Sequence, residues 1–330
     1  MKQIFNPYLG EGRYLPDGEP HVFGDRLYVY CSQDKFNAKR FCVGDYEVYS
    51  APLTDLSAWS CKKVALPRKN KYNKSGRKCM WAPDCTRGGD GKYYLYFCFN
   101  FENRICVARS DEPDGPFEII GAVRHENGAI YGTAKGDFMC FDPAVYTDEQ
   151  GITYLYSGFA PRKLMAFGLK LEGLKNAGGR GAQVMKLRPD MLTIDGEPAQ
   201  CVPGCDNSAG TGFEGHEFYE ASSLRKIGER YYFVYSTINS HELAYATADT
   251  PAGPFKYGGV IISNGDFGIG GEPDEAKAYW GNNHGSLVQL GGQWYIFYHR
   301  QTNKTEQSRQ GCAEPVEIGE DGKIAQVEVT

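Results

Sequence analysis

The chain alternates short apolar runs with turns, and five of these runs share one pattern. Each begins at a glycine and continues into a dense stretch of aromatic and β-branched residues, which is typical of a buried β-strand. The five runs are GDRLYVYCS from Gly24, GKYYLYFCF from Gly91, GITYLYSGF from Gly151, GERYYFVYS from Gly228 and GGQWYIFYHR from Gly291. Successive runs are 60 to 78 residues apart when their central tyrosines are aligned. Internal repetition at this spacing indicates a repeated structural unit.

A second, shorter motif lies about eleven residues before each of these tyrosines. It reads D-G-E-P-H-V-F, W-A-P-D-C, F-D-P-A-V, E-A-S-S-L and N-H-G-S-L in turn. Each motif carries one polar residue near its start, and these are Asp17, Asp84, Asp142, Glu220 and His284. We therefore expect each unit to open with a strand, turn tightly and continue into the aromatic strand. Residues 313–330 have the pattern of a final hairpin that completes the last unit.

Five such units with almost no helical periodicity predict an all-β fold. A five-bladed β-propeller accounts for them, since propellers have about four to eight blades, and residues 1–330 would form this single domain. The first strand of each blade lines the central channel, so the five polar residues would meet around one axis. The longer stretches 68–78, 125–137, 200–217 and 264–280 would form loops around a pocket at one end. An irregular β-sandwich with accidental internal similarity is the alternative.

Three aspartates, a glutamate and a histidine around one axis favour acid–base chemistry. Uncompensated buried charges are costly, and carboxylates close together raise one another's pKa. One carboxyl group can then stay ionised while another stays protonated. Glycoside hydrolysis uses such a pair. For any one of these residues taken singly, a satisfied polar side chain in a channel or turn is the alternative.

In this order and spacing, the motifs resemble those of glycoside hydrolase family 43, from about Asn6 to about Val329. The resemblance implies a five-bladed propeller that hydrolyses arabinofuranosyl or xylosyl linkages with inversion. It also implies that Asp17 is the general base, that Asp142 modulates a pKa, and that Glu220 is the general acid. An oligosaccharide of plant type is then the expected partner.

Two departures from the family pattern concern these residues. The usual base motif is D-P, whereas Gly18 follows Asp17 here and Glu19 precedes the proline. The V-F and L-Y-V-Y runs keep Asp17 in register, so we prefer it to Glu19. The fourth motif reads E-A-S-S without the common proline. In some members, the blade-five histidine holds a central calcium or other cation, which implies such a role for His284. A hydrogen bond to water or to a carboxylate is the alternative, and no organic cofactor is expected.

Further residues are candidates for contacts with a sugar. Trp81 precedes a channel strand, so it could stack on a sugar ring or pack between blades. Arg300 follows the last aromatic strand and could bind sugar hydroxyls or form a structural salt bridge. Phe36 and Phe213 are candidate pocket walls, and Asp84 is a candidate pocket-lining residue.

Composition and charge narrow the class of protein. Apolar residues make up 41% of the chain and charged residues 23%, which excludes a disordered or fibrous chain. The net charge of −5 argues against nucleic-acid binding. Eleven cysteines, an odd number, fit a reducing compartment better than a disulfide scaffold.

The start of the chain, MKQIFNPYLGEG, lacks the apolar core of a signal peptide. No apolar run approaches the ~20 residues that cross a bilayer. We therefore expect a cytoplasmic protein without a membrane partner, although a secreted protein whose leader has been removed would look the same.

Two other functions fit the same motifs. One is a propeller that binds carbohydrate without catalysis, and the other is a related five-bladed hydrolase acting on galactan, fructan or agar oligosaccharides. The sugar, the linkage, the choice between exo and endo cleavage and the oligomeric state are left open by the sequence.

Overall fold

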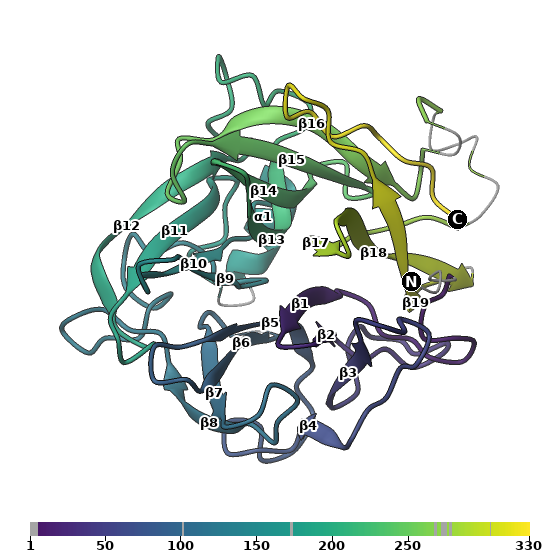
Figure 1. The fold of residues 1–330 in the computed structure, drawn as a ribbon. Helices are drawn as coiled ribbons and strands as arrows, with labels where there is room; N and C mark the ends of the chain where they lie inside the picture. Colours follow the sequence, from purple (N-terminus) through teal and green to yellow (C-terminus); the bar gives the residue numbers. More distant parts are fainter. Residues whose placement is uncertain are drawn as a thin grey trace.

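The computed structural model describes residues 6–100, 102–171, 174–266, 269–271, 276, 279–303 and 305–330. Its strands form five antiparallel sheets around a central axis, as Figure 1 shows. The fold is therefore the five-bladed β-propeller that the repeat predicts. A single α-helix, α1 (Lys163–Leu171), is found in the described residues, within blade three. Nothing helical in this part of the chain has the length and apolarity needed to cross a membrane.

Each blade is a meander of consecutive strands, with four strands in blades one to four and three in blade five. Blade one contains β1 (Glu19–Phe23), β2 (Arg26–Tyr30), β3 (Tyr46–Pro52) and β4 (Val64–Leu66). Blade two contains β5 (Met80–Arg87), β6 (Tyr93–Phe99), β7 (Cys106–Ser110) and β8 (Glu118–Ala122). Blade three contains β9 (Ala144–Thr147), β10 (Thr153–Ser157), β11 (Gly181–Leu187) and β12 (Ile194–Pro203). Blade four contains β13 (Phe218–Ile227), β14 (Arg230–Thr237), β15 (Glu242–Ala248) and β16 (Lys256–Ser263). Blade five contains β17 (Ser286–Leu290), β18 (Gln293–Asn303) and β19 (Thr305–Val316).

The innermost strand begins with the same backbone kink in four blades. Asp17, Ala82, Asp142 and Ala221 occupy matching places in the motifs, and all four have positive φ values between 37° and 65°. Such values are uncommon for residues that carry a Cβ atom. In blades two and four the strand pairing shifts register beside the kink. The kink thus recurs where the chain enters the channel. Because strained backbone is concentrated at functional sites, this end of the channel is a candidate site.

Residues two positions beyond the kink form a second layer of the channel, because alternate side chains of a strand share a face. Ser223 donates to Glu19 Oε1 at 2.7 Å, and its hydroxyl lies 2.6 Å from that of Ser286. Asp84 belongs to this layer as well, and its Oδ1 contacts His21 Nε2 at 2.6 Å. Arg225 donates to Glu19 at 2.9 Å. The deeper channel is therefore filled by paired polar side chains.

The aromatic second strands also hold neighbouring blades together. Three buried tyrosines of these strands each donate a hydrogen bond to a backbone carbonyl in a turn of the next blade. These bonds run from Tyr30 to Pro113 (2.6 Å), from Tyr96 to Met191 (2.8 Å) and from Tyr156 to Pro251 (2.6 Å). The tyrosine-rich runs therefore supply both blade cores and links between blades.

The N-terminal segment closes the ring against the last blade, where Figure 1 shows it beside β19. The Asn6 side chain accepts from the amide of Ala313 at 2.8 Å and donates to its carbonyl at 3.2 Å. The C-terminal turn at 319–323 forms, but the residues after it do not complete blade five as expected. The Val327 amide instead donates to the Ile261 carbonyl of β16 at 2.9 Å, and the Thr330 amide then donates to the Tyr298 hydroxyl of blade five at 3.2 Å.

Candidate active site

The kinked entries to the inner strands surround a cavity of about 330 Å³. Asp17, Asp142, Glu220 and His284 all line it, so the structure brings these four predicted residues together. Each of the four is at most 9% exposed. A cavity of this volume is within the range of small-molecule sites.

The walls of this cavity are mainly apolar and aromatic. They include Phe41, Trp81, Phe99, Met139, Phe141, Phe159, Met165, Leu169, Leu174 and Tyr219. Trp81 packs edge to face on Phe141, with ring centroids 4.9 Å apart and an angle of 72°. Its buried indole Nε1 has no hydrogen-bond partner among the described residues. The predicted sugar-facing residue Trp81 therefore lies at the cavity.

Asp17 is surrounded by positive charge. Arg309 Nη1 donates to Asp17 Oδ1 at 2.9 Å, and the same guanidinium group donates to Asp34 from Nε at 2.8 Å and from Nη2 at 3.1 Å. Burial by itself would raise the pKa of Asp17. The charges of Arg309 and His284 outweigh it and hold this pKa at about 2. Asp17 is therefore ionised at neutral pH.

His299 fixes the backbone at Asp17. Its Nδ1 accepts from the Asp17 amide at 3.2 Å, so this nitrogen carries no proton. Its Nε2 lies 2.8 Å from the Asn282 carbonyl and must donate to it. Burial and the nearby Arg309 lower the pKa of His299 to about 3. The imidazole is therefore neutral, and its Nδ1 accepts the hydrogen bond from the Asp17 amide.

Asp142 connects the third and fourth blades. Its Oδ2 accepts from the backbone amide of Ala221 at 3.2 Å, directly beside Glu220. His284 Nδ1 lies 3.5 Å from the same oxygen and 3.9 Å from Asp17 Oδ1. Burial would lower the pKa of His284, but Asp142 and Asp17 outweigh it and raise the pKa to about 9. His284 is therefore an imidazolium between two carboxylates.

Glu220 has the opposite environment from Asp17. No ion pair of the described residues joins its carboxyl group to a cation. Burial and the neighbouring Asp142 raise the pKa of Glu220 to about 8. Glu220 therefore carries a proton at neutral pH while Asp17 does not, and one cavity holds both a proton donor and a proton acceptor.

A cation held by His284 would have to replace the proton of its imidazole. A metal-binding imidazole must be unprotonated, and calcium takes about six to eight oxygen ligands. Deeper in the channel, ligand atoms of Glu19, His21 and Asp84 lie within 4.8 Å of one another. There Arg225 pairs with Glu19, and His21 pairs with Asp84. The surroundings of His284 favour the alternative prediction, contact with a carboxylate.

Four residues predicted to contact substrate do not line the cavity. Asp84 lies in the second channel layer, because the residue equivalent to Asp17 in blade two is Ala82. Phe36 is 49% exposed and stacks on Tyr14 instead. Phe213 is 1% exposed in a blade core.

Arg300 is the fourth residue that does not line the cavity, and Arg309 is the arginine that does. Arg300 pairs with Gln310 across the hairpin of β18 and β19, whereas Arg309 pairs with Gln301. The side chains of Arg300 and Arg309 therefore face opposite sides of the sheet. Arg300 reaches the carbonyl of Thr330. No local motif marks Arg309, since its partner Asp34 is 275 residues away.

The model of the glycosyl hydrolases family 43 matches residues 11–324. The chain belongs to this family. A xylosidase/arabinosidase of Thermoclostridium stercorarium is 49% identical over 332 aligned residues, which cover 100% of this chain and 67% of the relative. A xylosidase/arabinosidase of Bacteroides ovatus is 32% identical, covering 88% of this chain and 87% of the relative.

Solved structures of the same family have the same fold. The GH43_1 enzyme from Xanthomonas citri, complexed with xylose, has a TM-score of 0.74 and 28% identity, covering 97% of this chain and 92% of that chain. A β-xylosidase/α-arabinofuranosidase from a compost microbial metagenome, in a calcium-free complex with xylotriose, has a TM-score of 0.73 and 27% identity. That alignment covers 97% of this chain and 96% of the other. This family 43 chain is therefore a glycoside hydrolase.

Proposed function

We propose that this hydrolase removes terminal xylosyl or arabinofuranosyl units from oligosaccharides with inversion of configuration. The observation that carries the proposal is the pair of carboxyl groups in one cavity, with pKa values of about 2 for Asp17 and about 8 for Glu220. Two relatives that match this chain are named xylosidase/arabinosidase, which supports the choice of sugars.

In the proposed reaction, Asp17 is the general base and Glu220 the general acid. The Asp17 carboxylate takes a proton from water as the water oxygen bonds to the anomeric carbon. The bond from that carbon to the leaving oxygen breaks, and Glu220 gives its proton to this oxygen. Water must fit between base and sugar, so we expect the two carboxyl groups to lie about 6.5–9.5 Å apart.

Asp142 and His284 prepare Glu220 for this step. The negative charge of Asp142 keeps the proton on Glu220, and its bond to the Ala221 amide holds the adjacent backbone in place. His284 neutralises part of the charge that Asp17 and Asp142 share.

The cavity wall supplies recognition of a terminal sugar. Trp81 presents an aromatic face and an unpaired indole N–H, and α1 adds Met165 and Leu169 to the wall. Sugars expose both apolar C–H faces and hydroxyl groups, so this mixture suits them. A cavity of this size, enclosed by loops, favours removal of terminal units.

Product stereochemistry tests the proposal. Proton NMR should show the inverted anomer as the first product from para-nitrophenyl β-D-xyloside or para-nitrophenyl α-L-arabinofuranoside. Net retention would rule out the assigned mechanism. Binding of xylotriose with no product from either glycoside would favour a carbohydrate-binding protein without catalysis.

A further inference from the structure

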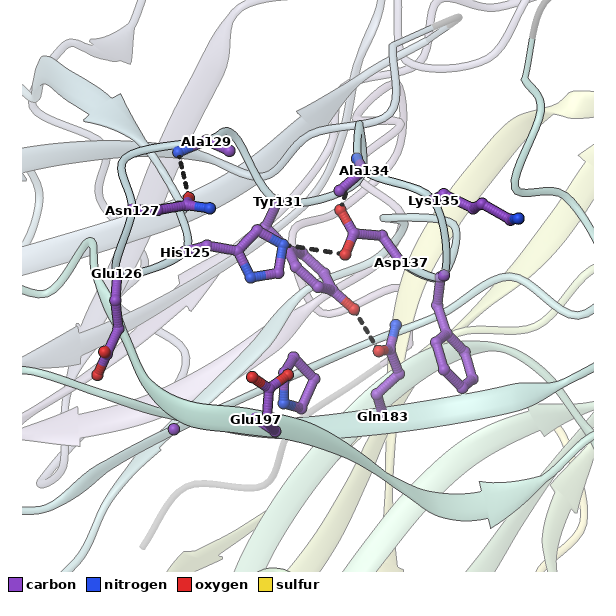
Figure 2. Close-up of a pocket in the computed structure, with 14 residues that line it drawn as sticks. His125, Glu126, Asn127, Ala129, Tyr131, Ala134, Lys135, Asp137, Gln183 and Glu197 are labelled. Atoms are coloured by element: carbon purple, nitrogen blue, oxygen red, sulfur yellow. Dashed lines mark hydrogen bonds and ion pairs between the residues drawn. The ribbon is translucent and has the colours of Figure 1, made fainter.

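A second cavity, of about 550 Å³, shares none of its lining residues with the first. It lies in blade three, between the loop that joins β8 to β9 and the strands β11 and β12 (Figure 2). We propose that this cavity is a second binding site, which holds a neutral oligosaccharide of pentose units and takes no part in bond cleavage. The choice of pentose units rests on the proposed function, whereas the cavity does not.

Gln183 of β11 is the residue that points to a ligand. Its side chain is completely buried, and its Oε1 accepts from the hydroxyl of Tyr131. Gln183 lines the cavity, and its buried Nε2 has no hydrogen-bond partner among the described residues. Buried amide donors are nearly always paired, and a ligand hydroxyl would supply the missing acceptor.

The opposite wall is rigid before any ligand binds. His125 Nε2 lies 2.9 Å from Asp137 Oδ1, and Asp137 Oδ2 accepts from the amides of Gly132 at 2.8 Å and Ala134 at 2.9 Å. Figure 2 shows the ring of His125 beside that of Tyr131, and both residues line the cavity. Their centroids are 5.3 Å apart. The cavity therefore has a fixed polar wall next to aromatic rings, and such preorganisation favours binding.

The charges around the cavity define the class of ligand. Glu197 and Glu126 are exposed lining residues, of which Glu126 pairs with Arg188, and Lys135 is an exposed lining lysine. Carboxylates repel phosphates and other anions, while they accept hydrogen bonds from hydroxyl groups. A buried amide donor together with the carboxylate of Glu197 matches a neutral polyhydroxyl compound.

The position of the cavity favours a ligand related to the substrate. Phe138 lines the second cavity, and the next residue, Met139, lines the first. The chain continues through Phe141 to Asp142, which also line the first cavity. One loop thus borders both cavities, so a ligand in the second would be held near the active site.

Titration calorimetry with xylotriose tests the proposal. The protein used is the Glu220→Gln variant, in which hydrolysis of the probe should be about 10²- to 10⁴-fold slower than in the wild type. We expect two binding events. Adding Gln183→Met should remove one event by deleting the amide donor, and adding Trp81→Ala should weaken the other.

A second variant covers the case in which Gln183→Met fails to fold. Glu197→Ala changes only an exposed edge of the cavity and should weaken the second event at least fivefold. Glu229→Ala, an exposed glutamate that lines neither cavity, is the matched control and should leave both events unchanged.

The outcomes separate this inference from the proposed function. If neither Gln183→Met nor Glu197→Ala alters binding, the second site is refuted. If binding depends on Gln183 but not on Trp81, the second site stands and the proposed active site does not take xylotriose.

Discussion

Asp17 and Glu220 have similar carboxyl groups in one cavity, yet their pKa values are about 2 and about 8. Both are buried, so burial does not distinguish them. Arg309 contacts Asp17 directly, whereas the charge with the largest effect on the pKa of Glu220 is the carboxylate of Asp142. At the scale of residues, the placement of one guanidinium group and one carboxylate therefore decides which group holds the proton.

Replacing Glu220 by Gln should distinguish substrates by their leaving group. A poor leaving group needs the proton, so kcat/KM on xylobiose should fall about 10²- to 10⁴-fold. An activated aryl xyloside should lose much less. Asp17→Asn should reduce hydrolysis of both, because both need the base. Equal losses on both substrates in the Glu220→Gln variant would contradict the acid role.

The pH profile of kcat/KM should follow these two pKa values. Activity should fall as pH rises through about 8, because Glu220 then loses its proton. The acid limb depends on Asp17 staying ionised, and Arg309 lowers the Asp17 pKa. Arg309→Gln should therefore move the acid limb to higher pH.

Arg300→Gln is the matched control for this profile. Arg300 belongs to the same hairpin but does not line the cavity, so its variant should keep the wild-type profile. An unmoved acid limb in Arg309→Gln would contradict the role given to Arg309.

At the scale of elements, two features shape the cavity. The left-handed kinks at Asp17, at Asp142 and at Ala221, next to Glu220, bring these three carboxyl groups to the cavity. Helix α1, inserted between β10 and β11, adds an apolar wall. The kinks thus present the reacting groups, and the helix contributes to the shape of the site.

Helix α1 should affect binding of substrate rather than catalysis. Leu169 lines the cavity, so Leu169→Ala should raise KM for xylobiose about fivefold through lost apolar contact, with little change in kcat. Leu164 of the same helix is 85% exposed, and Leu164→Ala is the control. If both variants have wild-type KM, the helix does not contribute to the bound state.

At the scale of the whole molecule, the ring is closed by contacts between its two ends. Asn6 bonds twice to the backbone of Ala313, and Tyr8 donates to the Gly311 carbonyl at 3.2 Å. Arg309 and its partner Asp34 lie in the same two blades. Closure of the ring and assembly of the Asp17 environment therefore depend on the same interface between blades one and five.

Asn6→Ala should lower the melting temperature by about 2–4 °C, because it removes the hydrogen bonds of the Asn6 side chain to Ala313, Glu314 and Thr330 across this closure. Thermal unfolding followed by circular dichroism measures the change. Glu11→Ala alters an exposed residue near the same end and should have no effect. Equal melting temperatures for Asn6→Ala and wild type would show that the closure does not depend on Asn6.

The blades could be predicted from the sequence because each is a meander of consecutive residues. Turn glycines, aromatic strands and the motifs before them all act over short distances, so Asp17, Asp142, Glu220 and His284 could be identified directly. The prediction that residues 313–330 complete blade five was wrong, because the same short-range signals give a turn but not the strand with which the following residues pair. The turn is local and does form, but the strand edge with which the later residues pair belongs to blade four.

The protonation states could be decided only by the tertiary structure. Arg309 pairs with residues more than 270 positions away, and Asp84 was misplaced by a register difference of two residues. The unpaired amide of Gln183 likewise depends on which loop covers β11. Local patterns determine strands and turns because their energies depend on neighbours in sequence. Charge and hydrogen bonding depend on neighbours in space, and only the closed ring of blades brings these together.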